Sequence, residues 1–220
     1  MKGFFKLNLK KKIEVEKFYT FFDSLELDEN DARLYALKPF RKRKIFYARY
    51  ENNELKALSQ NSFKQNVNDE RSKARKFSIL VPTKQELLLL KNLTETVIAD
   101  SSRKLPHIPK KFNITFHFVQ IIASKKGETN SPEGIHRDGF DLLFPCIVIA
   151  RKNIKGGVSR MFSKINDDFK LINSEVIKEG ECLVVDEKHF KDLYHDVSPI
   201  YLVSKKIPGY RNIIGLDINF

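Results

Sequence analysis

His136 and Asp138 are two positions apart in the segment EGIHRDGF, and His195 follows them in the segment YHDVSP. We expect this segment to be a strand, in which alternate side chains face the same side, so this imidazole and this carboxylate can coordinate one metal ion together. A second histidine from a distant segment completes a set of two histidines and one carboxylate. Such a set leaves coordination positions open and is typical of non-haem Fe(II) oxygenases. His-x-Asp triplets also occur by chance on protein surfaces, so the surrounding residues decide the interpretation.

An arginine near the C-terminus offers a cation for an acidic cosubstrate. Arg211 opens the last predicted strand, after His195 in the chain. If 2-oxoglutarate bound iron through its keto-acid end, its distant carboxylate would need a partner inside the fold. Arginine suits this role because its planar guanidinium binds a carboxylate through two hydrogen bonds; an ordinary surface arginine after a turn is the alternative. The pattern thus predicts Fe(II), 2-oxoglutarate and O₂ as cofactors, with Arg211 as the carboxylate anchor.

The elements that must position these residues are predicted to be short strands. After Pro109, β-like runs separated by turn residues occupy 112–124, 141–151, 158–165, 169–177, 181–186, 197–204 and 211–220. Several short strands with turns between them indicate a sandwich or barrel. The strands do not alternate with helices, as they would in a parallel sheet, so a parallel sheet is not expected. We therefore expect a mainly β protein with flanking helices, built on a double-stranded β-helix (jelly-roll or cupin-like) core.

The first half of the chain has a mixed pattern. Residues 13–25 have the apolar spacing of an amphipathic helix, and Thr83 with Glu86 forms a capping-box pattern before a predicted helix at 87–99. Strands are expected at 41–49 and 77–81, and residues 60–72 are expected to be a polar loop. We expect residues 1–220 to form one domain, in which 1–110 support a core at 111–220 that holds the metal site.

Composition limits the class of protein. Forty Lys and Arg against 28 Asp and Glu give a net charge of +12. The basic residues come in short separate runs typical of solvated surface, so nucleic acid is a possible but not a favoured partner. Cys146 and Cys182 lie in apolar runs, which predicts buried free thiols and a reducing compartment. No apolar run has the length of a signal-peptide core or a membrane span, so we expect a cytoplasmic protein without membrane attachment.

Several segments together resemble a known family. They are HFVQ from His117, PEGIHRDG from Pro132, RKN from Arg151 with GGVS from Gly156, HDVSPI from His195 and GYRN from Gly209, in this order. They resemble the bacterial 2-oxoglutarate and Fe(II)-dependent dioxygenases that include the free L-isoleucine hydroxylases. More weakly, FYARY from Phe46 resembles an N-terminal segment of that family.

The resemblance implies a jelly-roll dioxygenase that hydroxylates a C–H bond, most simply of a free L-amino acid, with release of succinate and CO₂. It carries over His136, Asp138 and His195 as iron ligands and Arg211 as the cosubstrate anchor. Two positions depart from the family: Gln120 stands where Arg is frequent, and Asn212 follows Arg211 where Asp is frequent. These departures put substrate contacts and the orientation of Arg211 in doubt, because partners of a binding residue set its geometry.

For several further candidate residues, the sequence leaves both a binding role and a structural role open. The candidates for contacts to the cosubstrate are Asn153, Ser159 and Ser198, and those for contacts to the substrate are Arg49, Tyr47, Gln120 and His117. Each has an ordinary structural alternative, such as a turn for Asn153 or a core position for His117. Two other functions stay open: the same chemistry on an anionic, carrier-bound or nucleic-acid substrate, and a non-catalytic jelly-roll binding protein. The oligomeric state is not predicted.

Overall fold

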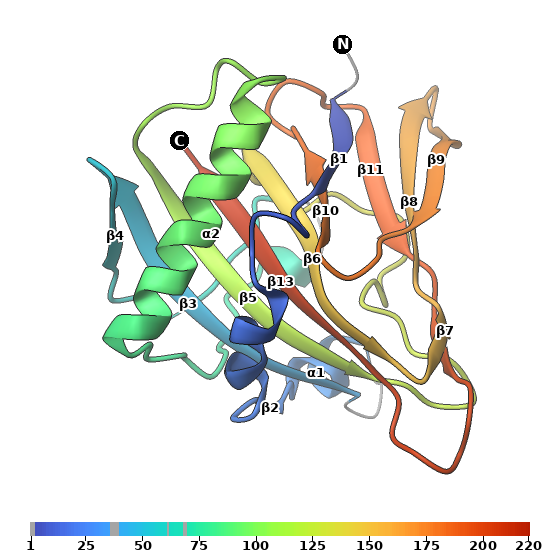
Figure 1. Cartoon of the computed structure of the whole chain (residues 1–220). Helices are drawn as coiled ribbons and strands as arrows, with labels where there is room; N and C mark the ends of the chain where they lie inside the picture. The colour runs from blue at the N-terminus through green and yellow to red at the C-terminus, as the bar shows by residue number, and fades with distance from the viewer. Residues whose placement is uncertain (1–2, 36–39, 61, 68–69) are drawn as a thin grey trace.

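The computed structural model describes residues 3–35, 40–60, 62–67 and 70–220 (Figure 1). Its large antiparallel sheet has the order β1 (Phe4–Asn8), β10 (Glu181–Val185), β6 (Leu142–Lys152), β13 (Tyr210–Asn219), β5 (Phe112–Ile122), β3 (Arg41–Glu51) and β2 (Glu26–Leu27), with β4 (Glu54–Ala57) paired to β3. A second sheet has the order β11 (Leu193–Val197), β8 (Val158–Ile165) and β9 (Asp168–Val176). A short pair joins β12 (Ile200–Leu202) to β7 (Ile154–Gly156).

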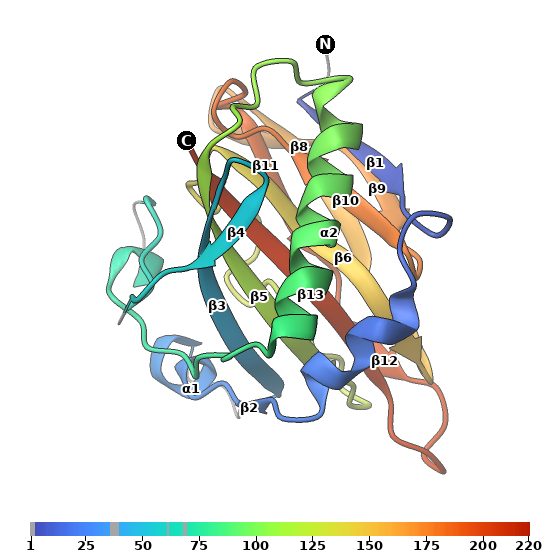
Figure 2. The same cartoon turned by 60° about the vertical axis from the view of Figure 1, so that its left-hand side comes forward.

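Within the described residues, four helical segments complete the fold. They are the 3₁₀ helices η1 (Val15–Phe22) and η2 (Glu70–Ser72) and the α-helices α1 (Asn30–Tyr35) and α2 (Lys84–Ser102). Helix α2 lies across one face of the large sheet, and the sheet β11–β8–β9 lies at its other face (Figure 2). Antiparallel sheets with helices outside them confirm the predicted fold class.

Strand alternation divides the core into two layers. On β5, Phe116 faces α2 and packs in one apolar cluster with Leu93 and Val97 of that helix. Val119, which points to the other side, packs in a second cluster with Met161 of β8. Because neighbouring side chains of a strand point to opposite faces, the same strands supply both layers. The second layer surrounds the candidate site.

The capping box predicted for α2 is present. Glu86 N donates to Thr83 Oγ1 at 3.2 Å, and Thr83 N donates to Glu86 Oε2 at 2.8 Å. These bonds satisfy two amides that the first helical turn would otherwise leave without partners, and so they fix where the helix begins. Upstream, the predicted helix at 13–25 is shorter and forms the 3₁₀ turn η1, whose buried side chains are aromatic: Phe18, Phe21 and Phe22.

Three local predictions were wrong. Residues 77–81 do not form a strand: an isolated parallel bridge joins Ile79 to Ile45 of β3, and the pairing does not continue into a ladder. The predicted strand at 197–204 is divided between the end of β11 and β12, with Pro199 between them, where it has no amide proton for a ladder. His136 lies in an irregular segment with one bridge rather than in a strand.

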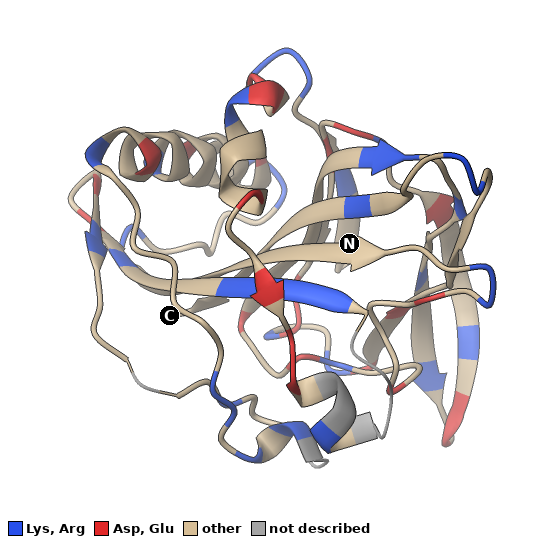
Figure 3. Ribbon diagram, turned by 90° about the horizontal axis from the view of Figure 1, so that it is seen from below, with Lys and Arg blue, Asp and Glu red and all other residues tan. Residues whose placement is uncertain are grey.

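Lys and Arg are distributed over strands, loops and helices rather than gathered on one element (Figure 3). Within the described ranges, no helix combines the length and the apolar character needed to cross a membrane.

Candidate metal centre

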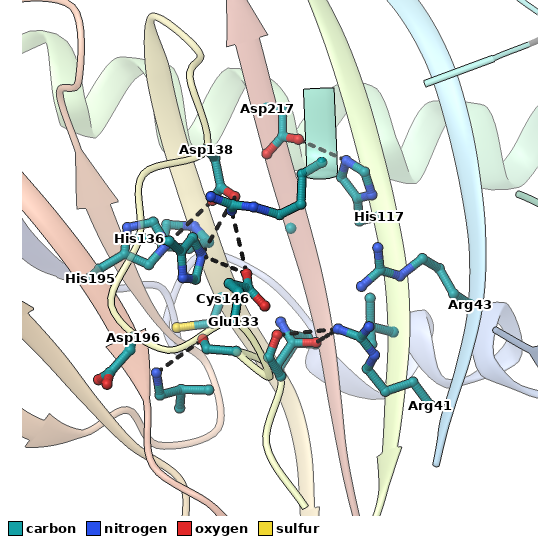
Figure 4. A pocket seen from close by; sticks show the side chains of 18 of the residues that line it. Arg41, Arg43, His117, Glu133, His136, Asp138, Cys146, His195, Asp196 and Asp217 are labelled. Carbon is teal, nitrogen blue, oxygen red and sulfur yellow. Dashed lines mark hydrogen bonds and ion pairs between the residues drawn. The ribbon is translucent and has the colours of Figure 1, made fainter. Parts of the chain in front are cut away.

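Three side chains from two distant segments converge between the sheets. His136 Nε2 lies 3.6 Å from Asp138 Oδ1, and His195 Nε2 lies 3.3 Å from Asp138 Oδ2. The potential ligand atoms of all three residues lie within 4.8 Å of one another. Both histidines are buried, and Figure 4 shows their rings side by side next to the carboxylate. The arrangement can hold one metal ion through two imidazoles and one carboxylate.

The backbone brings the two histidines together. His136 and His195 form a β-bridge, in which His136 N donates to His195 O at 2.9 Å and His195 N donates to His136 O at 2.8 Å. Directly paired residues of an antiparallel bridge project to the same side, which places the ring centroids 4.5 Å apart. Gly134 and Gly139, at φ +83° and +77°, allow the sharp bends at either end of the segment.

The outer contacts of the triad leave its ligand atoms available. His136 Nδ1 lies 2.8 Å from Gly134 O, which fixes the ring proton on Nδ1 and leaves Nε2 facing Asp138. Gln65 Nε2 donates to Asp138 Oδ1 at 2.6 Å, and Arg71 Nη1 lies 3.4 Å from the same oxygen. The other oxygen, Oδ2, therefore faces His195. Such supporting contacts orient metal ligands in known sites, so the residues fit a metal ion.

A buried glutamate supports the same segment from behind. Glu187 Oε1 accepts from Asp138 N at 3.0 Å, and Glu187 Oε2 accepts from Gly139 N at 2.8 Å. The Glu187 side chain is fully buried, with Oε1 3.9 Å from His195 Nδ1. Burial and the nearby Asp138 carboxylate raise the pKa of Glu187. Glu187 thus accepts hydrogen bonds from the backbone of the segment that holds Asp138 and lies near the ring of His195.

The pKa shifts follow from burial and mutual charge. Burial lowers the pKa of His136, an effect that the attraction of Glu133 opposes only partly. Burial alone would raise the pKa of Asp138, but the hydrogen bond from His195 and the charges of both histidines hold it well below its usual range. Burial disfavours a charged His195, yet Asp138 and Glu187 raise its pKa. The centre is thus an ionised carboxylate that attracts positive charge, as a metal ligand set must.

A cavity opens from this centre toward the large sheet, and Arg211 of β13 and Ser159 of β8 line it. Arg211 is 1% exposed, and its Nε and Nη2 have no hydrogen-bond partner within the described part of the chain. A buried guanidinium with open donors is costly unless an anion pairs with it. This side chain fits the distant carboxylate of 2-oxoglutarate, whose other end would bind the metal.

The opposite wall of the cavity has mixed charge. His117 Nε2 lies 2.8 Å from Asp217 Oδ2, a pair that joins β5 to β13. Arg41 and Arg43 of β3 point into the same space from the side across from the triad (Figure 4). Glu133, whose Oε1 lies 3.2 Å from His136 Nε2, adds a carboxylate near the candidate metal ligands. The cavity therefore offers both anionic and cationic groups to a small ligand.

Three other residues that the sequence suggested do not line the cavity. Tyr47 is buried on the cavity side of β3 without lining the cavity, and burial raises its pKa to about 12. Gln120 lies on the opposite face of β5 from His117 and donates to Asn212 Oδ1 at 3.1 Å. The Arg49 side chain is 43% exposed, beside Glu51 at the outer end of β3.

Two predicted cosubstrate contacts have local structural partners instead. Asn153 has φ +51°, and its side chain bonds the backbone of Ser204 and Ile207. Ser198 Oγ accepts from Val158 N at 2.9 Å. Neither side chain lines the cavity. Among the predicted cosubstrate contacts, the cavity thus collects Arg211 and Ser159.

Sequence reasoning missed three supporting residues. Gln65 and Arg71 lie in the segment expected to be a polar loop, yet their side chains are buried against Asp138. Glu187 lies in the polar run DEKH after β10. The available signal for Glu187 was a pair of carboxylates, Asp186 and Glu187, that follows a buried strand. Nothing in the local pattern of the loop marks Gln65 or Arg71.

Comparisons with known proteins agree with this geometry. A family model described as 2OG-Fe dioxygenase matches residues 19–217. No curated protein matches the chain. Among solved structures, IDO from Bacillus thuringiensis superposes with a TM-score of 0.75 at 18% identity, over 100% of this chain and 94% of that chain.

Two further structures have the same fold. A bsmA homolog from Methylobium petroleophilum PM1 gives a TM-score of 0.74 at 17% identity, over 99% of this chain and 88% of that one. An Fe(II)/α-ketoglutarate-dependent dioxygenase named TqaL gives 0.63 at 13% identity, over 99% and 82%. The family match covers most of the sequence, and this chain belongs to the 2OG-Fe dioxygenase family, which uses Fe(II), 2-oxoglutarate and O₂.

Proposed function

We propose that this protein hydroxylates a C–H bond of a small molecule, a free L-amino acid in the first instance, with His136, Asp138 and His195 as its iron ligands. The supporting observation is the convergence of two imidazoles and one carboxylate beside a cavity that contains a buried arginine. Two histidines and one carboxylate leave coordination positions for a cosubstrate and for O₂. The subfamily that includes the free L-isoleucine hydroxylases is the corresponding finer assignment.

Arg211, assisted by Ser159, holds the distant carboxylate of 2-oxoglutarate in this proposal. The open donors of Arg211 support it, because they lie in the cavity without a partner in the described protein. Cys146 Sγ, 3.8 Å from Ser159 Oγ, connects the two sheets at the same place. This contact positions the Ser159 hydroxyl on the wall of the cavity.

When bound, iron with 2-oxoglutarate and O₂ supplies an oxidant: one oxygen atom enters succinate as CO₂ leaves, and the other enters the hydroxylated product. The chain's own residues position the reactants. Gln65 and Arg71 hold one oxygen of Asp138, so that the other faces His195. The apolar side chains of Val119, Leu183 and Ile213 line the cavity and limit the access of water to the reaction.

The charges on the cavity wall support the proposed substrate class. Arg41 and Arg43 are cations that suit a carboxylate, and Asp217 and Glu133 are carboxylates that suit an ammonium group. A zwitterionic small molecule would match both kinds of charge. His117 holds one oxygen of Asp217 and thus orients the other. This combination favours a free amino acid over a neutral substrate.

We also propose that residues 1–220 act as one domain in the cytoplasm. Strands β1 and β3, from the first half of the chain, join the sheet that the second half builds. The cysteines, Cys146 and Cys182, are buried free thiols, as proteins of a reducing compartment have.

The proposal is tested by substrate-stimulated release of succinate. The Fe(II)-loaded protein is offered each free L-amino acid, and for every active one also its N-acetyl and amide derivatives. We expect stimulation by a free amino acid, and loss of most of it when either charge of the substrate is removed. Asp217→Asn should raise KM for that substrate, whereas Asp168→Asn, at an exposed position, should not.

A second candidate is the same reaction on an anionic substrate. The observation that favours it is the number of arginines that line the cavity: Arg41, Arg43, Arg71, Arg75 and Arg211. Stimulation by carrier-linked or N-acetylated amino acids, but not by free ones, would favour this candidate over a zwitterionic substrate. Stimulation by oligonucleotides that falls steeply with salt would identify a nucleic-acid substrate.

A further inference from the structure

A second cluster of two histidines and one carboxylate lies outside the cavity. His107 comes from the connection between α2 and β5, and Asp186 directly follows β10. His189 comes from the connection between β10 and β11. None of these residues lines the cavity of the candidate centre. The cluster therefore joins two connections that are distant in the sequence.

The nitrogen and oxygen atoms of this cluster converge. His107 Nε2 lies 3.2 Å from Asp186 Oδ2, and His189 Nδ1 lies 3.1 Å from Asp186 Oδ1. The two ring centroids are 3.9 Å apart, and all three potential ligand atoms lie within 4.8 Å of one another. Two ligands each about 2.0–2.1 Å from a tetrahedral ion are themselves roughly 3.3 Å apart. The two histidine–carboxylate distances, 3.2 and 3.1 Å, are close to that separation.

The charge of the carboxylate is not balanced by a permanent cation. The Asp186 side chain is 1% exposed, whereas the side chains of His107 and His189 are 32% and 45% exposed. Within the described ranges, Asp186 forms ion pairs with these two histidines and with no Lys or Arg. A buried carboxylate is costly unless a positive charge pairs with it. The two imidazoles lie between this carboxylate and solvent, where an arriving cation would meet all three.

We propose that His107, Asp186 and His189 bind a divalent transition-metal ion, with Zn²⁺ the best-fitting species and water completing its coordination. Two imidazole nitrogens and one carboxylate oxygen are ligands that Zn²⁺ accepts in tetrahedral sites. The half-exposed rings have room to adjust around an ion. The alternative is a metal-free cluster in which both rings simply hydrogen-bond to Asp186.

The bound ion would have a structural effect. It would fasten the connection after α2 to the connection after β10. Asp186 also precedes Glu187, which contacts the backbone of Asp138 and lies 3.9 Å from His195 Nδ1. An ion held by Asp186 would therefore stabilise the segment that positions Glu187. The chain would then bind two metal ions in adjacent but separate sites.

The test is a Zn²⁺ titration of the untagged full chain after chelator treatment. Calorimetry monitors the titration, and elemental analysis counts the bound zinc. If both ligand sets bind Zn²⁺, the wild type should take up about two molar equivalents and His136→Ala about one. In the His136→Ala background, adding His107→Ala or His189→Ala should remove the remaining equivalent. Adding Lys110→Ala, an exposed position in the same connection as His107, should not.

Thermal unfolding supplies a readout that does not depend on activity. Zn²⁺ should raise the Tm of His136→Ala and leave that of His136→Ala/His189→Ala unchanged. Circular dichroism of the metal-free variants checks that each one folds. The proposal is overturned if His136→Ala binds no Zn²⁺, or if its remaining equivalent survives both the His107 and the His189 substitutions.

Discussion

His136 and His195 donate a backbone hydrogen bond to each other, over 2.9 and 2.8 Å, although they belong to distant segments of the chain. The pair places both imidazoles on one side of the bridge and beside Asp138. A main-chain bridge is stiffer than a side-chain contact, so the separation of the two imidazoles is set before any ion binds. Preorganisation of this kind lowers the cost of binding a metal.

Glu187→Gln should weaken metal binding. The substitution removes a buried negative charge near His195 and places an amide NH₂ against one of the backbone amides of Asp138 and Gly139. Loss of a supporting partner of this kind costs about 10–100-fold in metal affinity. Titration with Mn²⁺ in place of Fe(II) measures the change, with the exposed Glu54→Gln as the control. Equal Mn²⁺ affinities of Glu187→Gln and Glu54→Gln would show that Glu187 does not support the metal site.

Arg211→Lys should weaken the binding of 2-oxoglutarate while the metal still binds. A lysine retains the charge but loses the paired hydrogen bonds of the guanidinium. A hydrogen bond to a charged group contributes about 1.5–3 kcal/mol, so Kd for 2-oxoglutarate should rise by roughly tenfold or more. Anaerobic calorimetry on the metal-loaded protein measures this Kd. Arg103→Lys, at a position 78% exposed, makes the same change away from the cavity and should have no effect.

Gly139→Ala and Gly134→Ala separate backbone strain from steric clash. Both glycines have a positive φ, where a non-glycine residue costs on the order of 1–3 kcal/mol. A Cβ at position 134 meets no atom within 4 Å, whereas one at position 139 collides with the backbone of Asn66. Gly139→Ala should therefore lower the Tm and the metal affinity more than Gly134→Ala does. Thermal melts and Mn²⁺ titrations compare them, and the reverse order would contradict the described path of the segment near Asn66.

Asp28 should make stability depend on pH in the acid range. Burial alone would raise the pKa of its carboxyl, but Arg43 and Arg41 hold it below the usual range. A lowered native pKa adds stability above the unfolded value of about 4, and this contribution disappears as pH falls through the native pKa. Asp28→Asn should thus lower the free energy of unfolding at pH 7 and have less effect in acid. Urea melts across pH measure this, and Asp23→Asn, at an exposed position, should show no such trend.

The candidate iron ligands His136, Asp138 and His195 could be proposed from the sequence, because their residue types and their order along the chain indicate them. The alternation of side chains along a strand could also be predicted from the sequence. Gln120 and His117 are three positions apart, so they face opposite sides of β5. The partners of Asp138 were not readable, because Gln65 and Arg71 reach it only through tertiary packing of a polar loop. Asn153 has the turn conformation that its residue type permits, so its amide bonds the local backbone rather than a ligand.

The most direct test of the central claim compares wild-type protein with Asp138→Ala and Asp168→Ala. Each is loaded anaerobically with Fe(II) and 2-oxoglutarate, then exposed to air with the free L-amino acids, and succinate is measured. The account predicts release that a particular substrate stimulates in the wild type and in Asp168→Ala, and that Asp138→Ala abolishes. Wild-type protein that binds no iron, or an Asp138→Ala variant that retains stimulated release, would contradict it.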